Sequence, residues 1–366
     1  MYINRPMKKT LLSLGIISVF ISKTELVQAQ QDPYTTHYAF NRMLYNPAVA
    51  GSKDRYCLTA LSHYQYLGYE DRTVEFWPDP ATPNSPQRPP ANKMVGPKTQ
   101  MFSFSAPLPK KYGGLGIGFI NDKLGYESST HVKIDAAGRL PLSADEASLS
   151  VGVEINFLQK GINGTQLRPL VPNDPSIPKQ QVNDRNVIFG AGVYYTNTMA
   201  NSAGSMRDLW VGYSALNLNQ PTFVFGNNIV FATPVTHHYI MGGITMTDFM
   251  GNPNMKLHPS AMIKYNRGIT QLDITGLVEF QEKLWGGLAY RTTSDALSIM
   301  LGYSGFKGTF QGLRIGYSYD LTLSRILSVS SGTHEIQLNY CFDIKIPPPP
   351  KIKILTPPFM NKTADE

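Results

Sequence analysis

Apolar and polar residues alternate in a long series of short segments between Arg55 and Asp343. In the last segment, residues 334–343, every second position is apolar: Ile336, Leu338, Tyr340 and Phe342. Successive side chains of a strand point to opposite faces, so this segment has one apolar and one polar face. A soluble sandwich shows the same alternation. The number of such segments and the aromatic residues near their ends favour a membrane barrel with lipid outside and water inside.

The alternation predicts an all-β fold: a transmembrane antiparallel barrel of about fourteen strands over residues 55–345. A short periplasmic segment, residues 30–54, precedes the barrel. A proline-rich periplasmic tail, residues 346–366, follows it and is expected to be disordered. The expected strands are 55–66, 98–106, 113–121, 131–140, 147–158, 187–195, 209–216, 236–247, 258–266, 271–280, 284–291, 297–303, 312–320 and 334–343.

Connection lengths predict how the barrel is oriented. Bacterial barrels keep short turns on the periplasmic side and longer loops outside, and an even strand count puts both chain ends in the periplasm. Connections after the first, fifth, seventh and thirteenth expected strands are long, at 67–97, 159–186, 217–235 and 321–333. Several connections after even strands are short, such as 141–146 and 281–283. Two connections, 196–208 and 248–257, are long for periplasmic turns.

The front of the chain predicts export by a signal peptide, residues 1–29. Basic residues at Lys8 and Lys9 precede an apolar run from Leu11 to Ile21, and small residues end at Ala29, where cleavage is expected. The apolar run is too short to cross a bilayer as a helix. The export signal and the barrel pattern together predict the outer membrane.

Bulk composition agrees with a barrel and excludes two other classes. The hydrophobic content is 42% and the mean hydropathy is −0.20, as expected when only alternate residues face lipid. No later stretch approaches 18 continuous apolar residues, which excludes a helical membrane protein. The net charge is +7 without a basic run, so nucleic-acid binding has no support.

The sequence has two cysteines, Cys57 in the first expected strand and Cys341 in the last. Alternation places both on the polar side that faces the lumen, and both fall toward the same rim. A disulfide across the barrel seam is therefore one interpretation in an oxidising periplasm. Two unpaired lumenal residues are the other, because the register that decides between them is not readable from the sequence.

The segment before the first strand is expected to contain a short helix. Residues 40–48 place apolar side chains at near-helical spacing, and a proline at position 47 disfavours helix at the residue before it. One hypothesis is that this helix plugs the periplasmic mouth of the lumen. The alternative is an ordered lead-in to the first strand.

Charged residues of both signs recur on the expected lumenal faces. A polar channel or a bound polypeptide would use them, but pairing with one another inside a narrow lumen is the favoured interpretation, because buried charges are usually paired. These residues are Lys133, Asp135, Arg139, Glu154, Asp273, Glu279, Arg291, Arg314, Asp320 and Glu335.

No motif predicts catalysis, a cofactor or a metal. The glycines of residues 113–118 lack the helix and the Gly-Lys-Ser/Thr ending of a phosphate loop, so they are expected to permit close packing of a strand. His237 and His238 are strand neighbours and point to opposite faces. No histidine, carboxylate or thiol cluster has metal-ligand spacing.

Several further motifs occur in a fixed order along the mature chain. These are Gln31-Asp32-Pro33, Tyr38-Ala39-Phe40-Asn41, Asn46-Pro47-Ala48-Val49-Ala50-Gly51, Gly114–Gly118 with Asn121-Asp122 and Gly125, His258-Pro259-Ser260, Trp285-Gly286-Gly287 through Tyr290-Arg291, Gly316–Asp320, and Gly332–Ile336. In order and spacing they resemble the PorP/SprF family of Bacteroidetes outer-membrane proteins over about residues 30 to 345. The proline-rich stretch 74–97 and the tail after 346 depart from the family pattern.

That resemblance implies a non-enzymatic barrel of the type IX secretion and gliding-motility machinery. The implied partners, besides outer-membrane lipid, are periplasmic ring proteins, peptidoglycan-binding proteins and secreted surface adhesins. The alternative is a passive porin or a transporter of hydrophobic solutes, since the Asn46-Pro47-Ala48 lead-in is also similar to that of long-chain fatty-acid transporters. Aromatic residues dominate interface hot spots, which adds Phe76 and Trp77 of the first long loop. The candidate partner contacts are Asp32, Pro33, Phe40, Asn46, Pro47, Phe76 and Trp77.

Overall fold

The computed structural model describes residues 33–69, 96–109, 112–143, 147–167, 177–198, 206–225, 229–292, 296–322 and 330–344. The chain divides into two units, residues 1–34 and residues 35–366. The second unit contains the barrel and the candidate site. The expected signal peptide, 1–29, and the expected tail, 346–366, lie outside the described residues.

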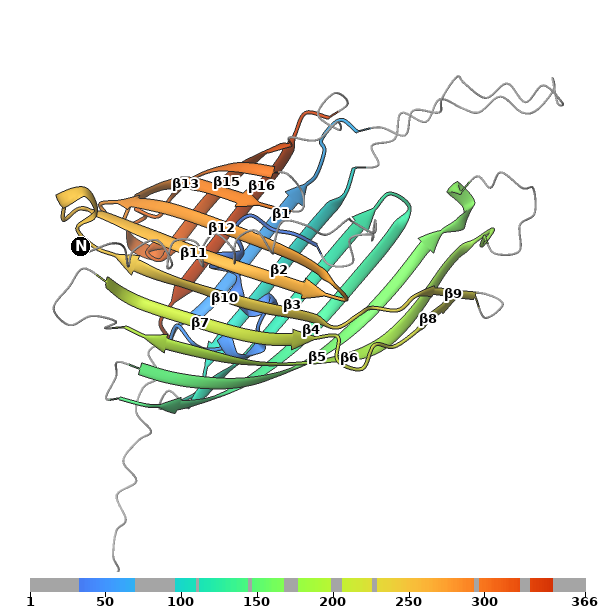
Figure 1. Cartoon of the computed structure of the whole chain (residues 1–366), viewed down its shortest axis with the longest axis horizontal. Coiled ribbons are helices and arrows are strands. Elements are labelled where there is room, and N and C mark those ends of the chain that lie inside the picture. The colour runs from blue at the N-terminus through green and yellow to red at the C-terminus, as the bar shows by residue number, and fades with distance from the viewer. Residues whose placement is uncertain are drawn as a thin grey trace, which may run out of the picture. The chain divides into compact units, whose positions relative to one another are not determined.

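Fourteen antiparallel strands in the described ranges form a closed barrel (Figure 1). Each strand pairs with its neighbour in the chain, β7 pairs with β10, and β1 pairs with β16 to close the ring. The predicted membrane barrel is therefore confirmed. The strands are β1 Tyr56–Tyr64, β2 Lys98–Pro107, β3 Gly113–Leu124, β4 Glu127–Pro141, β5 Ala147–Asn163, β6 Gln181–Asn197, β7 Met206–Leu216, β10 His237–Met246, β11 Met255–Asn266, β12 Ile269–Phe280, β13 Leu284–Arg291, β14 Ala296–Tyr303, β15 Leu313–Thr322 and β16 Thr333–Phe342.

Side chains on the two faces of the barrel wall have the polarity expected for a membrane protein. In β16, Glu335 and Gln337 face the lumen and are buried, whereas Ile336 and Leu338 are 51% and 43% exposed on the outside. A soluble sandwich buries its apolar face, so the exposed apolar face decides for lipid. Among the described residues, no helix is long and apolar enough to cross a membrane.

Two expected loops differ from the structure. The connection expected over 159–186 is shorter, because β5 and β6 continue to pair as far as Asn163 and Gln181. The connection expected over 217–235 contains a small hairpin made of β8, Phe223–Phe225, and β9, Ile229–Ala232. Residues 181–187 alternate between exposed and half-buried, so this end of β6 has no apolar face for a hydrophobic pattern to reveal.

The barrel has two rims with different connections. We call the rim at which β1 begins and β16 ends the near rim, and the opposite rim the far rim. Connections at the near rim include the short turns 142–146 and 281–283, whereas the far rim carries 65–97 and 164–180. Single turns of 3-10 helix, η5 Gly164–Gln166, η6 Phe249–Gly251 and η7 Gly308–Phe310, lie in three connections.

Candidate functional site

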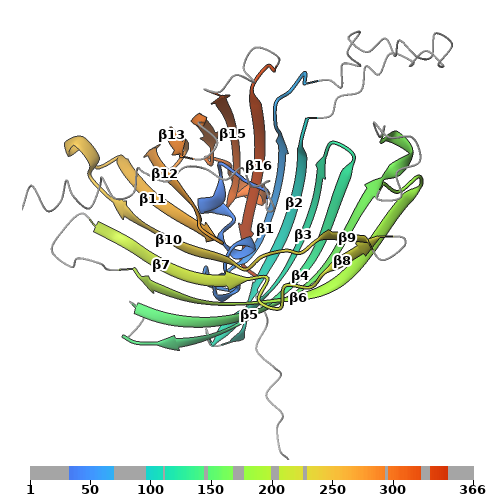
Figure 2. The same cartoon turned by 45° about the vertical axis from the view of Figure 1, so that its right-hand side comes forward.

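Residues 35–54, which we call the plug, lie inside the barrel (Figure 2). The plug forms three single turns of 3-10 helix: η1 Tyr38–Phe40, η2 Arg42–Leu44 and η3 Pro47–Val49. The continuous helix expected over residues 40–48 is therefore wrong. Asn46 is extended, with φ −147° and ψ 111°, as the residue before a proline prefers, and its side chain accepts a hydrogen bond from the Ala48 backbone nitrogen. Pro47 thus starts a turn instead of following a helix.

The first end of the plug is held on the far-rim side of β16 and β1 by one buried carboxylate. Glu335 accepts hydrogen bonds from the backbone nitrogens of Thr36 and His37, at 3.0 and 2.8 Å. Nδ1 of His37 lies 2.5 Å from the same carboxylate and Nδ1 of His63 lies 2.7 Å from it. His37, His63 and Glu335 are all fully buried. A carboxylate in such a place needs several partners, and here the plug supplies three of them.

The hydroxyl of Thr36 adds a second link to the wall, because it donates to the carboxylate of Asp320 at 3.0 Å. The hydroxyl groups of Thr35 and Tyr45 lie 2.7 Å apart and join two parts of the plug. Burial raises the pKa of Tyr45, so this hydroxyl stays neutral and available for hydrogen bonding at physiological pH.

The middle of the plug is held through its backbone carbonyls. Lys133 donates to the carbonyl of Leu44 at 3.0 Å and to the carboxylate of Glu154 at 3.1 Å. Three strands further along the wall, on β7, the hydroxyl of Ser214 donates to the carbonyl of Tyr45 at 2.5 Å. These bonds satisfy plug carbonyls that would otherwise be buried without partners.

Asn46 lies directly on the wall and is fully buried. Its amide donates to the carbonyls of Val193 on β6, at 2.9 Å, and Tyr213 on β7, at 3.3 Å. A Cβ atom added at Gly192 or Gly212 would collide with the Asn46 amide group. These two glycines therefore allow the close approach that both hydrogen bonds require.

The glycines of β3 serve the same purpose for other plug residues. Gly114, Gly116 and Gly118 face the lumen between outward apolar side chains. Added Cβ atoms at Gly116 and Gly118 would collide with Met43 and Leu44. The glycine-rich stretch 113–118 thus permits close packing, as its sequence context indicates.

The last part of the plug is held near the near rim. Arg139 donates to the Gly51 carbonyl and to the carboxylate of Asp54, both at 2.5 Å, and the Gly51 nitrogen donates to the Ser105 hydroxyl at 2.8 Å. Gly51 has φ +70° and packs against the backbone of Gly114, where a larger residue has no room.

The lumenal charges predicted from the sequence pair with one another or with the plug. The wall pairs are Lys133 with Glu154, Arg291 with Asp273 and Arg314 with Glu279, at 3.1, 3.4 and 3.3 Å. The plug pairs are Arg139 with Asp54, Asp320 with Thr36, and Glu335 with His37. Asp135 is fully buried and has no hydrogen-bond partner for its carboxylate oxygens in the described part of the chain. A lumen filled by paired charges was the favoured expectation, and the plug is a second partner of these charges, which the hypothesis of a plug at the periplasmic mouth did not specify.

A cavity of about 370 Å³ lies between the plug and the wall on the near-rim side. Phe40, Arg42 and Lys53 of the plug line it, together with wall residues from β6, β7, β10 to β13 and β15. Its lining reaches the near rim at Thr198 and Asp208, which flank the connection between β6 and β7.

The wall beside this cavity is irregular. Pro259 in β11 has no backbone N–H for the ladder, and the register of β10 against β7 shifts between Gly243 and Thr245. Pro259, Ile244 and Thr245 all line the cavity. Between the pairs on either side of this shift, β7 has two residues, Asp208 and Leu209, against one in β10, so β7 carries a bulge where the cavity meets the wall.

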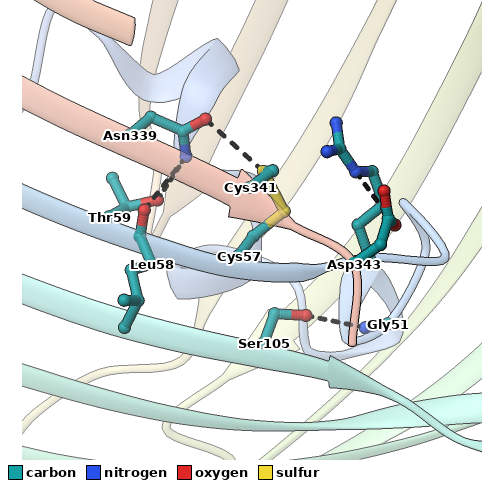
Figure 3. The surroundings of a disulfide bond; sticks show 9 residues. Gly51, Cys57, Leu58, Thr59, Ser105, Asn339, Cys341 and Asp343 are labelled. Carbon is teal, nitrogen blue, oxygen red and sulfur yellow. Dashed lines mark hydrogen bonds and ion pairs between the residues drawn. A yellow bond between two sulfur atoms is a disulfide. The ribbon is translucent and has the colours of Figure 1, made fainter. Parts of the chain in front are cut away.

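The seam of the barrel is closed by a disulfide between Cys57 of β1 and Cys341 of β16 (Figure 3). The two residues are direct partners in the register of the strands, 284 residues apart in the sequence. Asn339, two residues before Cys341, donates to the Thr59 hydroxyl at 2.7 Å and so adds a polar link across the same seam.

The predicted contact residues fall in different places. Phe40 is half-buried in the plug, where its ring packs against Trp285 at 5.0 Å between centroids. Asn46 and Pro47 are buried and contact the wall. Pro33 belongs to the unit of residues 1–34. Three further candidates lie outside the described residues: Asp32, Phe76 and Trp77.

The sequence analysis missed His37, His63, Arg42 and Lys53. The two histidines lie 26 positions apart, on the plug and on β1, and they meet only through a glutamate near the other end of the chain. Arg42 is the one cation between residues 38 and 45 of the plug. That isolated cation, two positions after Phe40, was the one available signal for the cavity.

Comparison with known proteins identifies the family. A family described as type IX secretion system membrane protein PorP/SprF matches residues 27–340, which is most of the chain. The chain belongs to the PorP/SprF family. Plug, wall and cavity all fall within the matched residues. Among curated proteins, no relative matches this chain.

Several solved barrels are similar to this PorP/SprF chain at low sequence identity. The Ralstonia pickettii toluene transporter TbuX is 13% identical with a TM-score of 0.46, over 84% of this chain and 94% of that one. A Pseudomonas aeruginosa FadL homologue is 12% identical with a TM-score of 0.41, over the same shares. CdiB from Acinetobacter baumannii is 8% identical with a TM-score of 0.35, over 79% of this chain and 60% of that one.

Proposed function

We propose that this protein is a non-enzymatic anchor in the outer membrane for the type IX secretion or gliding-motility machinery. It holds periplasmic ring or peptidoglycan-binding proteins, or a secreted surface adhesin, at one of its rims. Family membership supports the machinery, and the fold supports a place in a membrane. The near rim faces the periplasm in this proposal, because both ends of the barrel sequence are found there and the longest connections, 65–97, 164–180 and 217–236, lie at the opposite rim.

The filled lumen is the observation that carries the proposal. The plug is tied to opposite parts of the wall, through Glu335 on β16, Lys133 on β4 and Ser214 on β7. A passive porin keeps a water-filled channel, whereas a plugged barrel offers its rims and loops as rigid surfaces. The proposed anchor therefore transmits position or force across the membrane through the wall, and conducts no solute in its resting state.

Affinity purification of the tagged protein from gently solubilised outer membranes, followed by mass spectrometry, tests the proposal. Enrichment of periplasmic ring proteins, a peptidoglycan-binding lipoprotein or a large surface adhesin over an unrelated porin control is expected. A barrel that purifies alone would overturn the anchor and favour a transporter of hydrophobic solutes. Purified wild-type barrel in planar bilayers should stay closed, and deletion of residues 34–45 should open it.

A further inference from the structure

The cavity at the near-rim end of the plug contains cations without acidic partners. Arg42 donates to the hydroxyl of Tyr194 at 2.5 Å, and its guanidinium carbon lies 4.3 Å from the ring centre of Trp210. Lys53 lines the same cavity. Within the described ranges, no carboxylate forms an ion pair with either residue. Arg42 is thus held as a positive charge at the cavity, and Lys53 adds a second basic group to the same space.

Neither carboxylate that lines the cavity is paired with Arg42 or Lys53. Glu279 lies 3.3 Å from Arg314 and 3.7 Å from Nε2 of His258, so its charge is already paired with a guanidinium group. Asp208 lies at the start of β7, where its backbone nitrogen bonds to the Thr198 carbonyl at 3.2 Å. The cavity therefore has a neutralised side around Glu279 and a cationic side around Arg42 and Lys53.

Without a bound anion, the surroundings of Lys53 disfavour its charged ammonium form. Desolvation and the neighbouring guanidinium groups, of which Arg42 and Arg314 are the largest contributors, lower the pKa of Lys53 to about 7. An anion bound beside Lys53 reverses this effect, because it favours the charged ammonium form. Binding of an anion would then take up a proton at neutral pH.

Aromatic rings form the other surface of the cavity. Phe40 and Trp210 are half-buried, and Phe40 packs against Trp285. The guanidinium carbon of Arg314 lies 5.2 Å from the ring centre of Phe40. The site thus places apolar faces directly beside cations. A volume of about 370 Å³ is in the range of ligand pockets, which run from about 300 to about 1,000 Å³.

We propose that this cavity binds a carboxylate carried next to an aromatic or aliphatic side chain, as in an acidic segment of a polypeptide held at the near rim. The carboxylate pairs with Arg42 and Lys53, and the apolar side chain packs on Phe40 and Trp210. The proposal rests on the proposed function, since it names the chemistry by which a partner is recognised. Two sources share this chemistry: a separate periplasmic protein, and the chain's own residues 345–366, which follow β16 at the near rim and include Asp365 and Glu366.

The test uses the purified full-length barrel in detergent and a labelled four-residue peptide, blocked at both ends, with two glutamates between two phenylalanines. A counterpart with glutamines in place of the glutamates is the matched probe. Fluorescence anisotropy should give at least about tenfold tighter binding for the acidic peptide, and Lys53→Met should remove about tenfold of that affinity. Lys256→Met, which removes a near-rim lysine outside the cavity lining, should leave affinity unchanged.

The pH dependence provides a second readout that a structural defect would not reproduce. Affinity of the wild type for the acidic peptide should fall as pH rises from 6 to 9, because Lys53 loses its proton. Lys53→Arg should keep high affinity over this range. The charged and titratable groups that face Lys53 or line the cavity, and that both variants keep, are Arg42, Arg55, Arg314, His258, Asp208 and Glu279.

The outcomes separate this proposal from the proposed function. Equal binding of the two peptides, or equal losses in Lys53→Met and Lys256→Met, would overturn the cavity assignment while leaving co-purification of partners as an independent result. Tighter binding of the acidic peptide after Asp365→Asn with Glu366→Gln would assign the natural carboxylate to the chain's own tail. Unchanged binding in that variant would assign it to a separate protein.

Discussion

The two ends of the seam between β1 and β16 are closed in different ways. At the near-rim end, Cys57 and Cys341 form a covalent bond in which the plug has no part. Toward the far rim, Glu335 joins His63 of β1 to His37 of the plug, so the strand contact and the plug contact share one carboxylate. The comparison shows that one end of the seam is independent of the plug, whereas the other couples the wall to the contents of the lumen.

Removing the covalent end should have the largest effect on stability. A variant with Cys57→Ser and Cys341→Ser loses a bond that closes a loop of 284 residues, and chain entropy assigns about 5 kcal/mol to such a loop. The urea midpoint for unfolding of the purified barrel should fall strongly. Conductance should stay low while the barrel is folded, because the plug contacts remain. High conductance in the folded variant would contradict an independent near end.

Removing the shared carboxylate should give the opposite of the pattern expected for the disulfide variant: the barrel should stay folded, and its conductance should rise. Glu335→Ala leaves two buried imidazoles and two backbone N–H groups without their acceptor, at a cost on the order of 3–5 kcal/mol. With the disulfide intact, we expect a folded barrel with frequent channel openings in planar bilayers. Gln337→Ala is the control, because it removes a buried lumenal side chain two positions along β16 that forms no hydrogen bond with the plug. Equal conductance of the two variants would rule out a plug held by Glu335.

A third variant tests whether the plug is held in place by the contacts of its middle residues as well as by those of its first end. Asn46→Ala removes two hydrogen bonds to β6 and β7 and the bond that this side chain accepts from the Ala48 nitrogen, at a cost of about 2 kcal/mol. Channel openings should be less frequent than in Glu335→Ala. Gly192→Ala should reproduce the effect from the wall side, because its methyl group collides with Asn46. A silent Gly192→Ala variant would contradict close contact at this point.

The smallest change in stability is expected for a substitution that lies outside both ends of the seam. A hydrogen bond from Lys256 lowers the pKa of Glu282 in the exposed turn 281–283. Its folded-state pKa lies below the unfolded value, so its contribution to stability is present above the unfolded pKa and is lost as pH falls through the folded one. Solvent screening limits it to less than about 0.5 kcal/mol. Urea titrations of Glu282→Gln and wild type at neutral pH should nearly coincide.

The barrel was predictable because its signal is local and repeated. Each strand alternates polar and apolar residues by itself, so β5 and β16 could be found without knowledge of their neighbours. The ends of β5 and β6 could not be found in this way. Residues 181–187 of β6 have no apolar side to maintain the pattern, although their backbone pairing continues.

The contents of the lumen could not be predicted, because their partners are distant in the sequence. His37 and Glu335 are 298 residues apart, and Asn46 and Val193 are 147 apart. Composition indicated that lumenal charges would be paired. The partner of each charge is determined by the strand register and by the path of the plug. Helical spacing in residues 40–48 reflected a different cause, since these side chains pack against several strands of the surrounding wall, among them β3, β5 and β6.

The disulfide also has a consequence for how the protein is made. Cys57 lies in the first strand of the barrel to be synthesised and Cys341 in the last, so the bond forms only after nearly the whole barrel sequence has been made. A chain that stops early keeps a free thiol at Cys57, whereas a finished chain becomes a covalent ring. The seam is the strand pair with the longest separation in sequence, and the bond makes it a local contact. The bond is therefore present only in a chain whose first and last barrel strands have been brought together.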